Sequence, residues 1–266
     1  MRLTLFSSMG IAGSKNTKPS PLENASKTGR LVLADNKLES LPPGLWLLGH
    51  TLRLLDLSGN RLTELPSQIG SLIQLQSLKL SNNRLVRLPE EIYYLTNLKT
   101  LVADHNLLEY SSALPRGCLR NVDLSFNCFA GEVGHPSLAM PPCVYVCKLS
   151  DNRITSIAPS FGFETLRDLQ ELDLDNNSLK TIPSEIGALS KLSCLKLRNN
   201  MIETLPAELF HNTLLSRLHL EGNVLTLSTL REIDGFEKYL ERRKDRISKG
   251  MDHGLKQDQR ICGLLA

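Results

Sequence analysis

The stretch "LRLLDLSGNRLTELP" (52–66) decides the fold of this chain, because it recurs at regular intervals. Related copies are "LQSLKLSNNRLVRLP" (75–89), "LQELDLDNNSLKTIP" (169–183) and "LSCLKLRNNMIETLP" (192–206), and all four follow the pattern LxxLxLxxNxLxxLP, with Ile182 and Ile202 each replacing one leucine. Self-similarity at a fixed period of about 20 to 50 residues indicates a solenoid, in which each unit buries its apolar side only against its neighbours.

An asparagine marks the register of each unit, and successive marks are separated by 21 to 25 residues. In LxLxxN, alternate residues of a short strand point into the core, as Leu55 and Leu57 do, and the residues between them point outward. The asparagine amide then satisfies turn backbone groups that would otherwise be unpaired. The sequence therefore predicts a structural asparagine ladder at Asn36, Asn60, Asn83, Asn106, Asn127, Asn152, Asn177, Asn200 and Asn223.

The Leu-Pro pairs and the 23-residue spacing resemble intracellular leucine-rich repeat proteins over residues 25–227, especially those of Ras-pathway scaffolds and of plant intracellular Ras-group repeat proteins. The stretch "LEGNVLTLSTLREIDGFEKYLERRK" (220–244) is similar to the ending of a short vertebrate subfamily whose chain also opens with Met-Gly. The resemblance implies an α/β fold, a horseshoe-shaped solenoid of about nine repeats with a parallel concave β-sheet and a C-terminal capping helix. It also implies protein binding without catalysis.

The pattern divides the chain into a flexible N-terminal leader (1–24), the solenoid (25–227), a capping helix (228–247) and a flexible tail (248–266). We predict the capping helix from a capping box at Thr229 and Glu232 and from an apolar stripe behind it. The first repeat is expected to begin at Thr28 to Leu33 without a separate cap, and residues 10–24 are expected to cover it in part. Between the regular units, "FNCFAGEVGHPSLAMPPC" (126–143) contains several glycines and prolines, which predict a loop-like convex wall.

The cysteines are scattered, which indicates a reducing compartment and packed thiols rather than a disulfide framework. His135 is the only histidine near Cys118 and Cys143, and no zinc spacing is present, so we predict no metal site. The six are Cys118, Cys128, Cys143, Cys147, Cys194 and Cys262.

The 266 residues have a formal net charge of +3, and the excess of positive charge lies at the two ends. A nucleic-acid channel through the main body is therefore excluded. No apolar run approaches the roughly 18 residues that a membrane-spanning helix needs.

Outward-pointing positions form columns across the predicted concave sheet, and acidic and basic residues alternate along the column four residues before each asparagine. Two interpretations remain open: these charges neutralise one another, or they contact a protein partner. His105 and Phe126 each directly precede an asparagine, and we expect them to act as hot spots. The full candidate partner-binding set is Asp56, Lys79, His105, Asp123, Phe126, Lys148, Glu171, Asp173, Asp175, Lys196, Arg198 and His219.

No catalytic motif is present, and the histidines show no ligand spacing, so we predict neither an enzyme nor a cofactor. Flanking lysines are expected to keep Asp173 and Asp175 ionised. The favoured function is a monomeric, cytoplasmic scaffold or adaptor in signalling that binds a protein partner on the concave face. The alternatives are a regulatory subunit that targets or inhibits a phosphatase, ubiquitin ligase or small GTPase through the 126–143 loop, and a secreted recognition protein.

Near the start, "MGIAGSK" (9–15) matches the form of a myristoylation site, and Gly10 becomes an acceptor only if translation starts at Met9. One acyl chain gives marginal membrane binding, so a second signal is needed. The basic run "RRKDRISK" (242–249) either supplies that signal or forms the solvated face of the capping helix.

Overall fold

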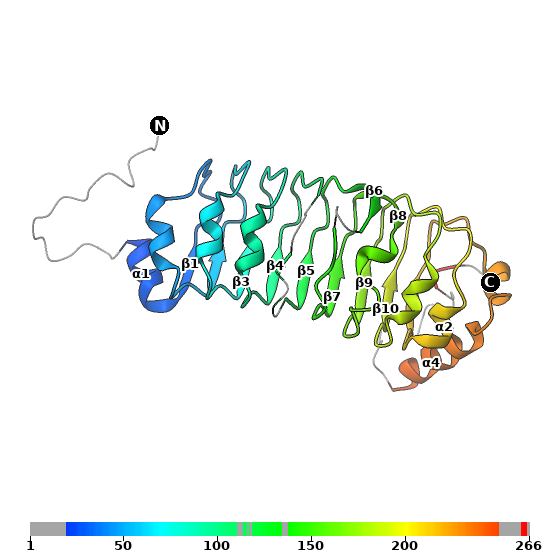
Figure 1. Ribbon diagram of the computed structural model, residues 1–266. Helices are drawn as coiled ribbons and strands as arrows, with labels where there is room; N and C mark the ends of the chain where they lie inside the picture. Colours follow the sequence, from blue (N-terminus) through cyan, green and yellow to red (C-terminus); the bar gives the residue numbers. More distant parts are fainter. Residues whose placement is uncertain are drawn as a thin grey trace, which may run out of the picture.

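The computed structural model describes residues 20–110, 114–115, 117, 119–134, 138–249 and 262–264, and these form an elongated solenoid (Figure 1). Nine short strands pair in parallel along its length in the order β1-β2-β3-β4-β5-β7-β9-β10-β11. Their bounds are Arg30–Val32 (β1), Leu54–Asp56 (β2), Ser77–Lys79 (β3), Thr100–Val102 (β4), Asn121–Asp123 (β5), Val146–Lys148 (β7), Glu171–Asp173 (β9), Cys194–Lys196 (β10) and Arg217–His219 (β11).

The side of the solenoid away from the sheet consists mainly of short helical turns (Figure 1). Pro66, Pro89 and Pro183 each precede such a turn in an extended conformation, so the Leu-Pro of the repeat begins the return segment. These turns are η1 (Pro43–Leu48), η2 (Ser67–Ser71), η3 (Glu90–Tyr94), η4 (Pro159–Phe161), η5 (Ser184–Ala188) and helix α2 (Glu208–Asn212).

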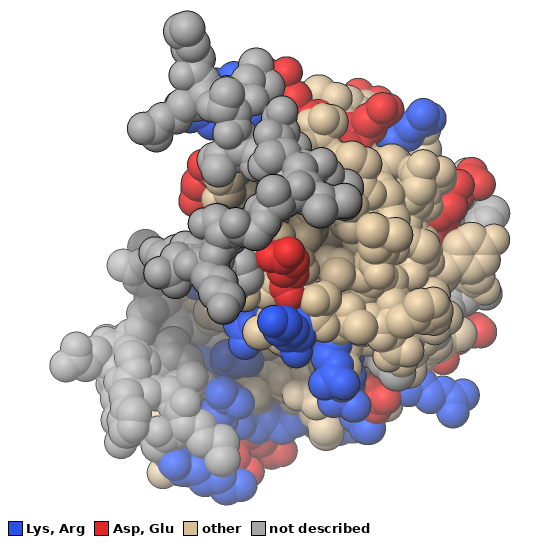
Figure 2. Space-filling view, turned by 90° about the vertical axis from the view of Figure 1, so that its left-hand side faces the viewer, with Lys and Arg blue, Asp and Glu red and all other residues tan. Residues whose placement is uncertain are grey.

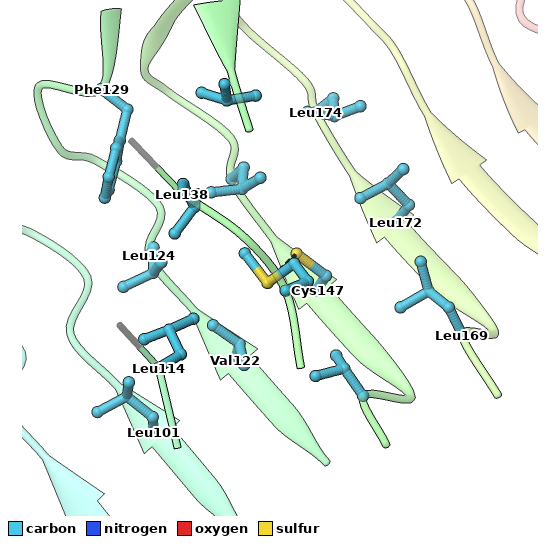
Figure 3. Close-up of a cluster of buried hydrophobic side chains, with 14 of the residues drawn as sticks. Leu101, Leu114, Val122, Leu124, Phe129, Leu138, Cys147, Leu169, Leu172 and Leu174 are labelled. Carbon is cyan, nitrogen blue, oxygen red and sulfur yellow. Dashed lines mark hydrogen bonds between the residues drawn. The ribbon is translucent and has the colours of Figure 1, made fainter. Parts of the chain in front are cut away.

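The core lies between the sheet and these turns, and it is built from one layer of apolar side chains per unit. Val122, Cys147 and Leu172 occupy equivalent positions on three neighbouring strands, and all three are fully or almost fully buried (Figure 3). Because every layer repeats the same contacts with the next one, the apolar core is continuous along the solenoid.

The side chains of the asparagine ladder hydrogen-bond neighbouring units to each other at the ends of the strands. The side-chain amide of Asn83 donates to the carbonyls of Leu57 and Leu80, and its oxygen accepts from the Leu62 amide. The same pattern recurs at the other internal marks, and their side chains are buried. Asn36 differs, because it lies at the N-terminal end, is exposed, and bonds only the Ala34 carbonyl with its amide group.

The predicted boundary of the N-terminal leader at residue 24, and the expectation of no separate cap, are wrong. Helix α1 (Pro21–Thr28) covers the first strand, with Ser20 and Glu23 forming a reciprocal capping box and Ala25 fully buried. Gly29 ends the helix in a left-handed conformation with φ 69°, which only glycine adopts without strain. The leader residues 1–19, including Gly10, lie outside the described residues.

The C-terminal cap contains two helices instead of the predicted single helix over 228–247. Helix α3 (Leu227–Arg231) begins at a capping box formed by Thr226 and Thr229, so the box predicted at Thr229 and Glu232 is wrong. Gly235 has φ 83° and separates α3 from helix α4 (Phe236–Ser248). The chain turns there, and this brings Phe236 and Tyr239 against Phe210 of α2.

Part of the tail predicted to be flexible over 248–266 packs on the solenoid. Cys262 is buried, its carbonyl accepts from the Leu220 amide at 3.0 Å, and its thiol lies 3.3 Å from the Tyr239 hydroxyl. Residues 262–264 therefore cover the strand edge at β11, which would otherwise be open. The rest of 250–266 lies outside the described residues.

The central irregular segment contains a strand, contrary to the predicted all-loop wall over 126–143. Strand β6 (Ala130–Val133) pairs in parallel with strand β8 (Arg153–Ile157) to form a second, two-stranded sheet. Gly131 has φ 71°, and the register shifts between it and Glu132. Glycine here permits a bulge in a strand. His135 and Cys118 lie outside the described residues.

Candidate partner-binding surface

The strand registers place the predicted columns side by side across the concave sheet face. Asp56 pairs with Lys79, Asp123 with Lys148, and Asp173 with Lys196 in register. We call this column, the last residue of each strand, the strand-end column. It runs Val32, Asp56, Lys79, Val102, Asp123, Lys148, Asp173, Lys196, His219.

Charges in this column pair with their neighbours. Lys79 lies 3.7 Å from Asp56 and Lys148 lies 3.4 Å from Asp123, with both lysine side chains well exposed. Lys148 therefore pairs toward β5, and Asp173 pairs with Lys196 at 2.9 Å. The two pairs with well-exposed lysines, Lys79–Asp56 and Lys148–Asp123, contribute about 0.2 to 1 kcal/mol each, so they stabilise the face weakly.

A denser network of charges occupies the C-terminal part of the face. Lys196 contacts Glu171 at 2.8 Å as well as Asp173. Arg198 contacts Glu221 at 3.0 Å and Asp175 at 3.7 Å, and it lies 2.7 Å from Nδ1 of His219. We call this set the C-terminal charge network, and it comprises Glu171, Asp173, Asp175, Lys196, Arg198, Arg217, His219 and Glu221.

Burial and pairing perturb several pKa values within this network. Burial alone would lower the pKa of Lys196, but its hydrogen bonds to Glu171 and Asp173 outweigh burial and raise it. Burial would raise the pKa of Glu171, and the contact with Lys196 lowers it overall. Burial lowers the pKa of His219, and the Arg198 charge adds to this effect. Lys196 and Glu171 therefore stabilise each other's charged forms, whereas the charged form of His219 is destabilised.

Asp175 has a raised pKa despite its flanking cations, although a carboxyl with this pKa is still mostly ionised at neutral pH. Burial raises its pKa to about 6, although the Arg198 amide donates to its carboxylate at 2.7 Å. The physical reason is the depth of the side chain, which is only 14% exposed. No motif in the sequence indicates that depth.

His105 and Phe126 form the most unusual feature of the face. Their rings stack with centroids 4.1 Å apart and planes 16° apart. Phe126 is 46% exposed and the His105 side chain 47% exposed, so the pair is presented to solvent. The His105 Nδ1 atom lies 2.7 Å from Oδ2 of Asp104, which fixes the imidazole ring.

The backbone at this pair has an unusual conformation for such residues. The position directly before each asparagine has positive φ in every unit, and both His105 and Phe126 have φ 53°. Bulky side chains rarely adopt this conformation, whereas Gly, Asn and Asp tolerate it. The other seven units have those residues: Asp35, Gly59, Asn82, Asp151, Asn176, Asn199 and Gly222.

Comparison with known proteins gives the family. A model of the leucine rich repeat family matches residues 26–85, 50–108 and 167–225, which is more than half of the chain. The chain belongs to the leucine-rich repeat family. Proteins of this family generally mediate protein–protein interactions, and the family and fold are typically non-catalytic.

Two curated relatives of this leucine-rich repeat chain come from rice, Oryza sativa subsp. japonica. Plant intracellular Ras-group-related LRR protein 8 is 29% identical over 173 residues, which is 65% of this chain and 34% of the relative. Plant intracellular Ras-group-related LRR protein 7 is 33% identical over 73 residues, which is 26% of this chain and 28% of the relative. The chain thus spans about a third of the length of these relatives.

Solved structures share the leucine-rich repeat fold. A leucine-rich repeat protein of Leptospira interrogans is 28% identical with a TM-score of 0.56, and the match covers 79% of this chain and 58% of that one. A TDR receptor is 26% identical with a TM-score of 0.57, with coverage of 74% and 35%. Both support the solenoid architecture.

The thiols of the leucine-rich repeat core are buried, which removes them from nucleophilic chemistry. Burial raises the pKa of Cys147 far above its ordinary value, and it raises the pKa of Cys194 to about 11 and that of Cys262 to about 12. A thiol that stays protonated is a weak nucleophile.

Within the part of the chain that the structure describes, no group of three or more His, Cys, Asp or Glu side chains is placed to hold a metal ion. The described helices also include none that is long and apolar enough to cross a membrane.

The sequence reasoning missed a row of basic residues at the edge where the strands begin. Arg53, Lys99 and Arg120 occupy the position seven residues before the asparagine, and backbone hydrogen bonds join successive members of this column. With Arg30 at the start of β1, they form what we call the basic rim, and all four side chains are exposed. The sequence signal for the rim is the residue seven positions before each asparagine, because Arg53, Lys99 and Arg120 all stand there. Figure 2 shows Lys and Arg side chains gathered in the lower part of the view onto the α1 end.

Proposed function

We propose that this leucine-rich repeat protein is a non-catalytic scaffold or adaptor that holds a protein partner on its concave sheet face, with His105 and Phe126 at the centre of the contact. The observation that carries the proposal is the stacked, exposed pair at positive φ. Strained backbone at exposed residues is typical of functional sites, and aromatic side chains dominate binding energy at interfaces.

The pair is poorly explained by folding alone. A bulky residue such as Phe126 in the left-handed region is disfavoured by about 1 to 3 kcal/mol, His105 by less because histidine is enriched there, and two half-exposed rings gain only part of their burial energy. Asn82 and Asn176 occupy the same position elsewhere with little strain. A partner that covers both rings would complete their burial, and this provides a physical reason for aromatic residues here.

The charged candidates receive a secondary role in this proposal. Asp56, Lys79, Asp123 and Lys148 pair with each other, and so does the C-terminal charge network. A charge that already has a partner gains less from a second one, because both must lose water on binding. These residues are therefore proposed to set the shape and the local polarity of the face.

The setting we propose is intracellular signalling. The curated relatives are named as plant intracellular Ras-group-related proteins, and the 220–244 stretch resembles the ending of leucine-rich repeat-containing protein 57. Membrane attachment is proposed only for a form that starts at Met9 and carries myristate on Gly10. Intact-mass spectrometry of the natively expressed protein tests this: an N-terminus at Met1 would refute attachment through Gly10.

The double variant His105→Asn/Phe126→Asn tests the partner-binding proposal, because asparagine suits this backbone position and removes both rings. Wild-type and variant proteins are used to capture partners from a lysate, and a captured protein is then purified and its affinity measured. We expect the variant to bind at least about ten times more weakly, as loss of central aromatic contacts does at interfaces.

Leu214→Asn serves as the matched control. Leu214 is 58% exposed and lies at the strand-start edge near β11, away from the pair. Its substitution removes a similar exposed apolar side chain and should leave the affinity unchanged. Equal loss in both variants, or loss in neither, would refute the proposed site.

A further inference from the structure

We infer that the basic rim (Arg30, Arg53, Lys99 and Arg120) binds an acidic segment of a protein partner, that is, a short extended stretch rich in Asp and Glu. This inference deepens the proposed function and rests on it, because the rim borders the same sheet face. The rim has no acidic neighbours in the described chain, its cations are spaced like the side chains of an extended peptide, and it lies beside the sheet face.

The rim cations have no carboxylate partner within the described part of the chain. Arg30, Arg53, Lys99 and Arg120 take part in none of the ion pairs there, which instead involve residues such as Lys79 and Lys196. The segments that build the rim, 27–30, 49–53, 72–76, 95–99 and 119–120, contain no Asp or Glu. This strip therefore contains cations and no carboxylate, unlike the strand-end column.

The first acidic residue along the same edge lies on the C-terminal side and is neutralised. Asp168 is held by Lys191 at 2.6 Å. The positive strip is thus confined to the half of the solenoid between β1 and β7, and its charge has no compensation there. Like charges held side by side repel each other, so an incoming anion relieves the repulsion as well as pairing with each cation.

The spacing of the rim fits an extended peptide. The Arg120 amide donates to the Lys99 carbonyl, the Lys99 amide to the Gln76 carbonyl, and the Gln76 amide to the Arg53 carbonyl. The backbone positions of Arg53 and Arg120 are therefore three strand spacings apart, or about 14 Å. An extended peptide places every second side chain on one side at about 7 Å intervals, so about five residues would span the distance from Arg53 to Arg120.

At the end of the rim nearest the centre of the solenoid, the Arg120 side chain is held by an aromatic ring. The Arg120 guanidinium lies 5.5 Å from the centre of the Tyr145 ring, over its face. This cation–π contact reduces the freedom of the side chain and leaves its outer N–H groups available to pair with a carboxylate. Phe126 lies in the same unit, about 20 Å further along the strand direction, so one partner of ordinary size reaches both.

The test uses a fluorescein-labelled peptide with about six consecutive glutamates and a matched glutamine peptide, titrated with the full chain. Fluorescence anisotropy is recorded at ionic strengths of about 0.05 and 0.15 M, because exposed charge pairs weaken as screening rises. We expect the glutamate peptide to bind at least about ten times more tightly than the glutamine peptide at the lower salt concentration.

The decisive variant is Arg53→Gln/Lys99→Gln/Arg120→Gln, with Arg61→Gln/Arg84→Gln/Arg153→Gln as the matched control. The control removes the same charge from three exposed arginines that directly follow an asparagine at the other end of the strands. The rim variant should bind the glutamate peptide about ten times more weakly, and the control should bind within about two-fold of wild type. Equal weakening by both variants, or by neither, would overturn the inference.

Two further measurements keep the inference open to refutation. Arg53→Lys/Arg120→Lys keeps the charge and should retain most of the affinity for the glutamate peptide. A large loss of affinity would show that charge is not what binds the peptide.

Phosphatidylserine vesicles and a single-stranded oligonucleotide are titrated in parallel with the peptide. If either one binds through the rim more tightly than the glutamate peptide does, the result would contradict a protein partner. If His105→Asn/Phe126→Asn loses the captured partner while the rim variant still binds both peptide and partner, the proposed function stands and this inference fails.

Discussion

In the C-terminal half of the concave sheet face, Lys196 contacts both Glu171 and Asp173, whereas in the N-terminal half Arg53 and Lys99 contact no carboxylate of the described chain. The two halves share one backbone, one asparagine ladder and one core. They differ in their ion pairs: Lys196 is paired with carboxylates of the same chain, whereas Arg53 and Lys99 are not paired within the described chain. We propose that the paired charges mainly stabilise the solenoid, and that the unpaired cations and the exposed aromatic pair contact a partner.

The largest expected effect comes from the asparagine ladder, which both halves share. Asn83→Ala and Asn177→Ala each remove a buried amide that bonds three carbonyls and one backbone N–H. Because the backbone partners stay buried, each variant should lose about 2 to 4 kcal/mol of unfolding free energy in urea denaturation. A much larger loss of unfolding free energy in one of the two variants would show that the asparagine ladder does not stabilise both halves equally. This would contradict the comparison.

The next effect distinguishes the halves directly. Lys196→Met removes the cation that contacts both Glu171 and Asp173 and leaves Glu171 with only Arg217 at 3.9 Å; both carboxylates are less than one quarter exposed. We expect a loss of about 1 to 3 kcal/mol. Lys79→Met is the matched control, because Lys79 is 45% exposed and lies 3.7 Å from Asp56, and it should lose at most about 0.5 kcal/mol. Similar losses in urea denaturation would contradict the distinction.

The pH dependence of stability provides a third test. Because burial raises the pKa of Asp175 to about 6 from an ordinary value of 3.8, the folded state binds a proton more tightly than the unfolded state. The contribution of Asp175 to stability therefore falls as pH rises from about 4 to 6 and stays level above that. Asp175→Asn should match wild type near pH 4 and exceed it by about 1 to 2 kcal/mol at pH 7.

Glu171 titrates in the opposite sense, since its pKa is lowered, and its contribution is lost as pH falls. That contribution is present in both proteins, so the difference between wild type and Asp175→Asn isolates Asp175. The measurement is the free energy of unfolding from urea titrations across this pH range. A difference that does not vary with pH would show that Asp175 is not a destabilised carboxylate.

The smallest expected effect is on the stability of the rim variant. Arg53→Gln/Lys99→Gln/Arg120→Gln removes no ion pair of the described chain and relieves repulsion, but it loses the Arg120–Tyr145 cation–π contact, so unfolding free energy should change by less than about 1 kcal/mol. Thermal unfolding followed by circular dichroism checks this. A clear loss of stability would mean that the rim cations have a structural role that their contacts do not reveal.

Much of the fold follows from the period of the asparagines. This period gave the strand register and the columns, because every Leu55-type and Asp56-type position repeats with it. The period carries no information about segments that do not repeat. Helix α1 was missed although Ser20, Pro21 and Glu23 form a recognisable capping signal, because it precedes the first unit.

The site was less predictable, because its properties depend on side-chain conformation. Lys148 has an acidic neighbour on each side, and only its rotamer decides that it pairs with Asp123. His105 and Phe126 were expected to point outward, but their stacking follows from the positive φ of the turn, which is not visible in the residue types themselves. The sequence signal for this pair is a comparison between units, because His105 and Phe126 stand at a position where the other units have Gly, Asn or Asp.

The measurement that tests the central claim most directly is the stability and the partner affinity of His105→Asn/Phe126→Asn, compared with those of Asp173→Asn/Lys196→Met. Asparagine relieves backbone strain at the aromatic positions, so the first variant should be at least as stable as wild type while binding at least about ten times more weakly. The second should be less stable and bind within about three-fold of wild type. The account is contradicted if the aromatic variant loses stability and keeps full affinity, or if the charge variant keeps its stability and loses the partner.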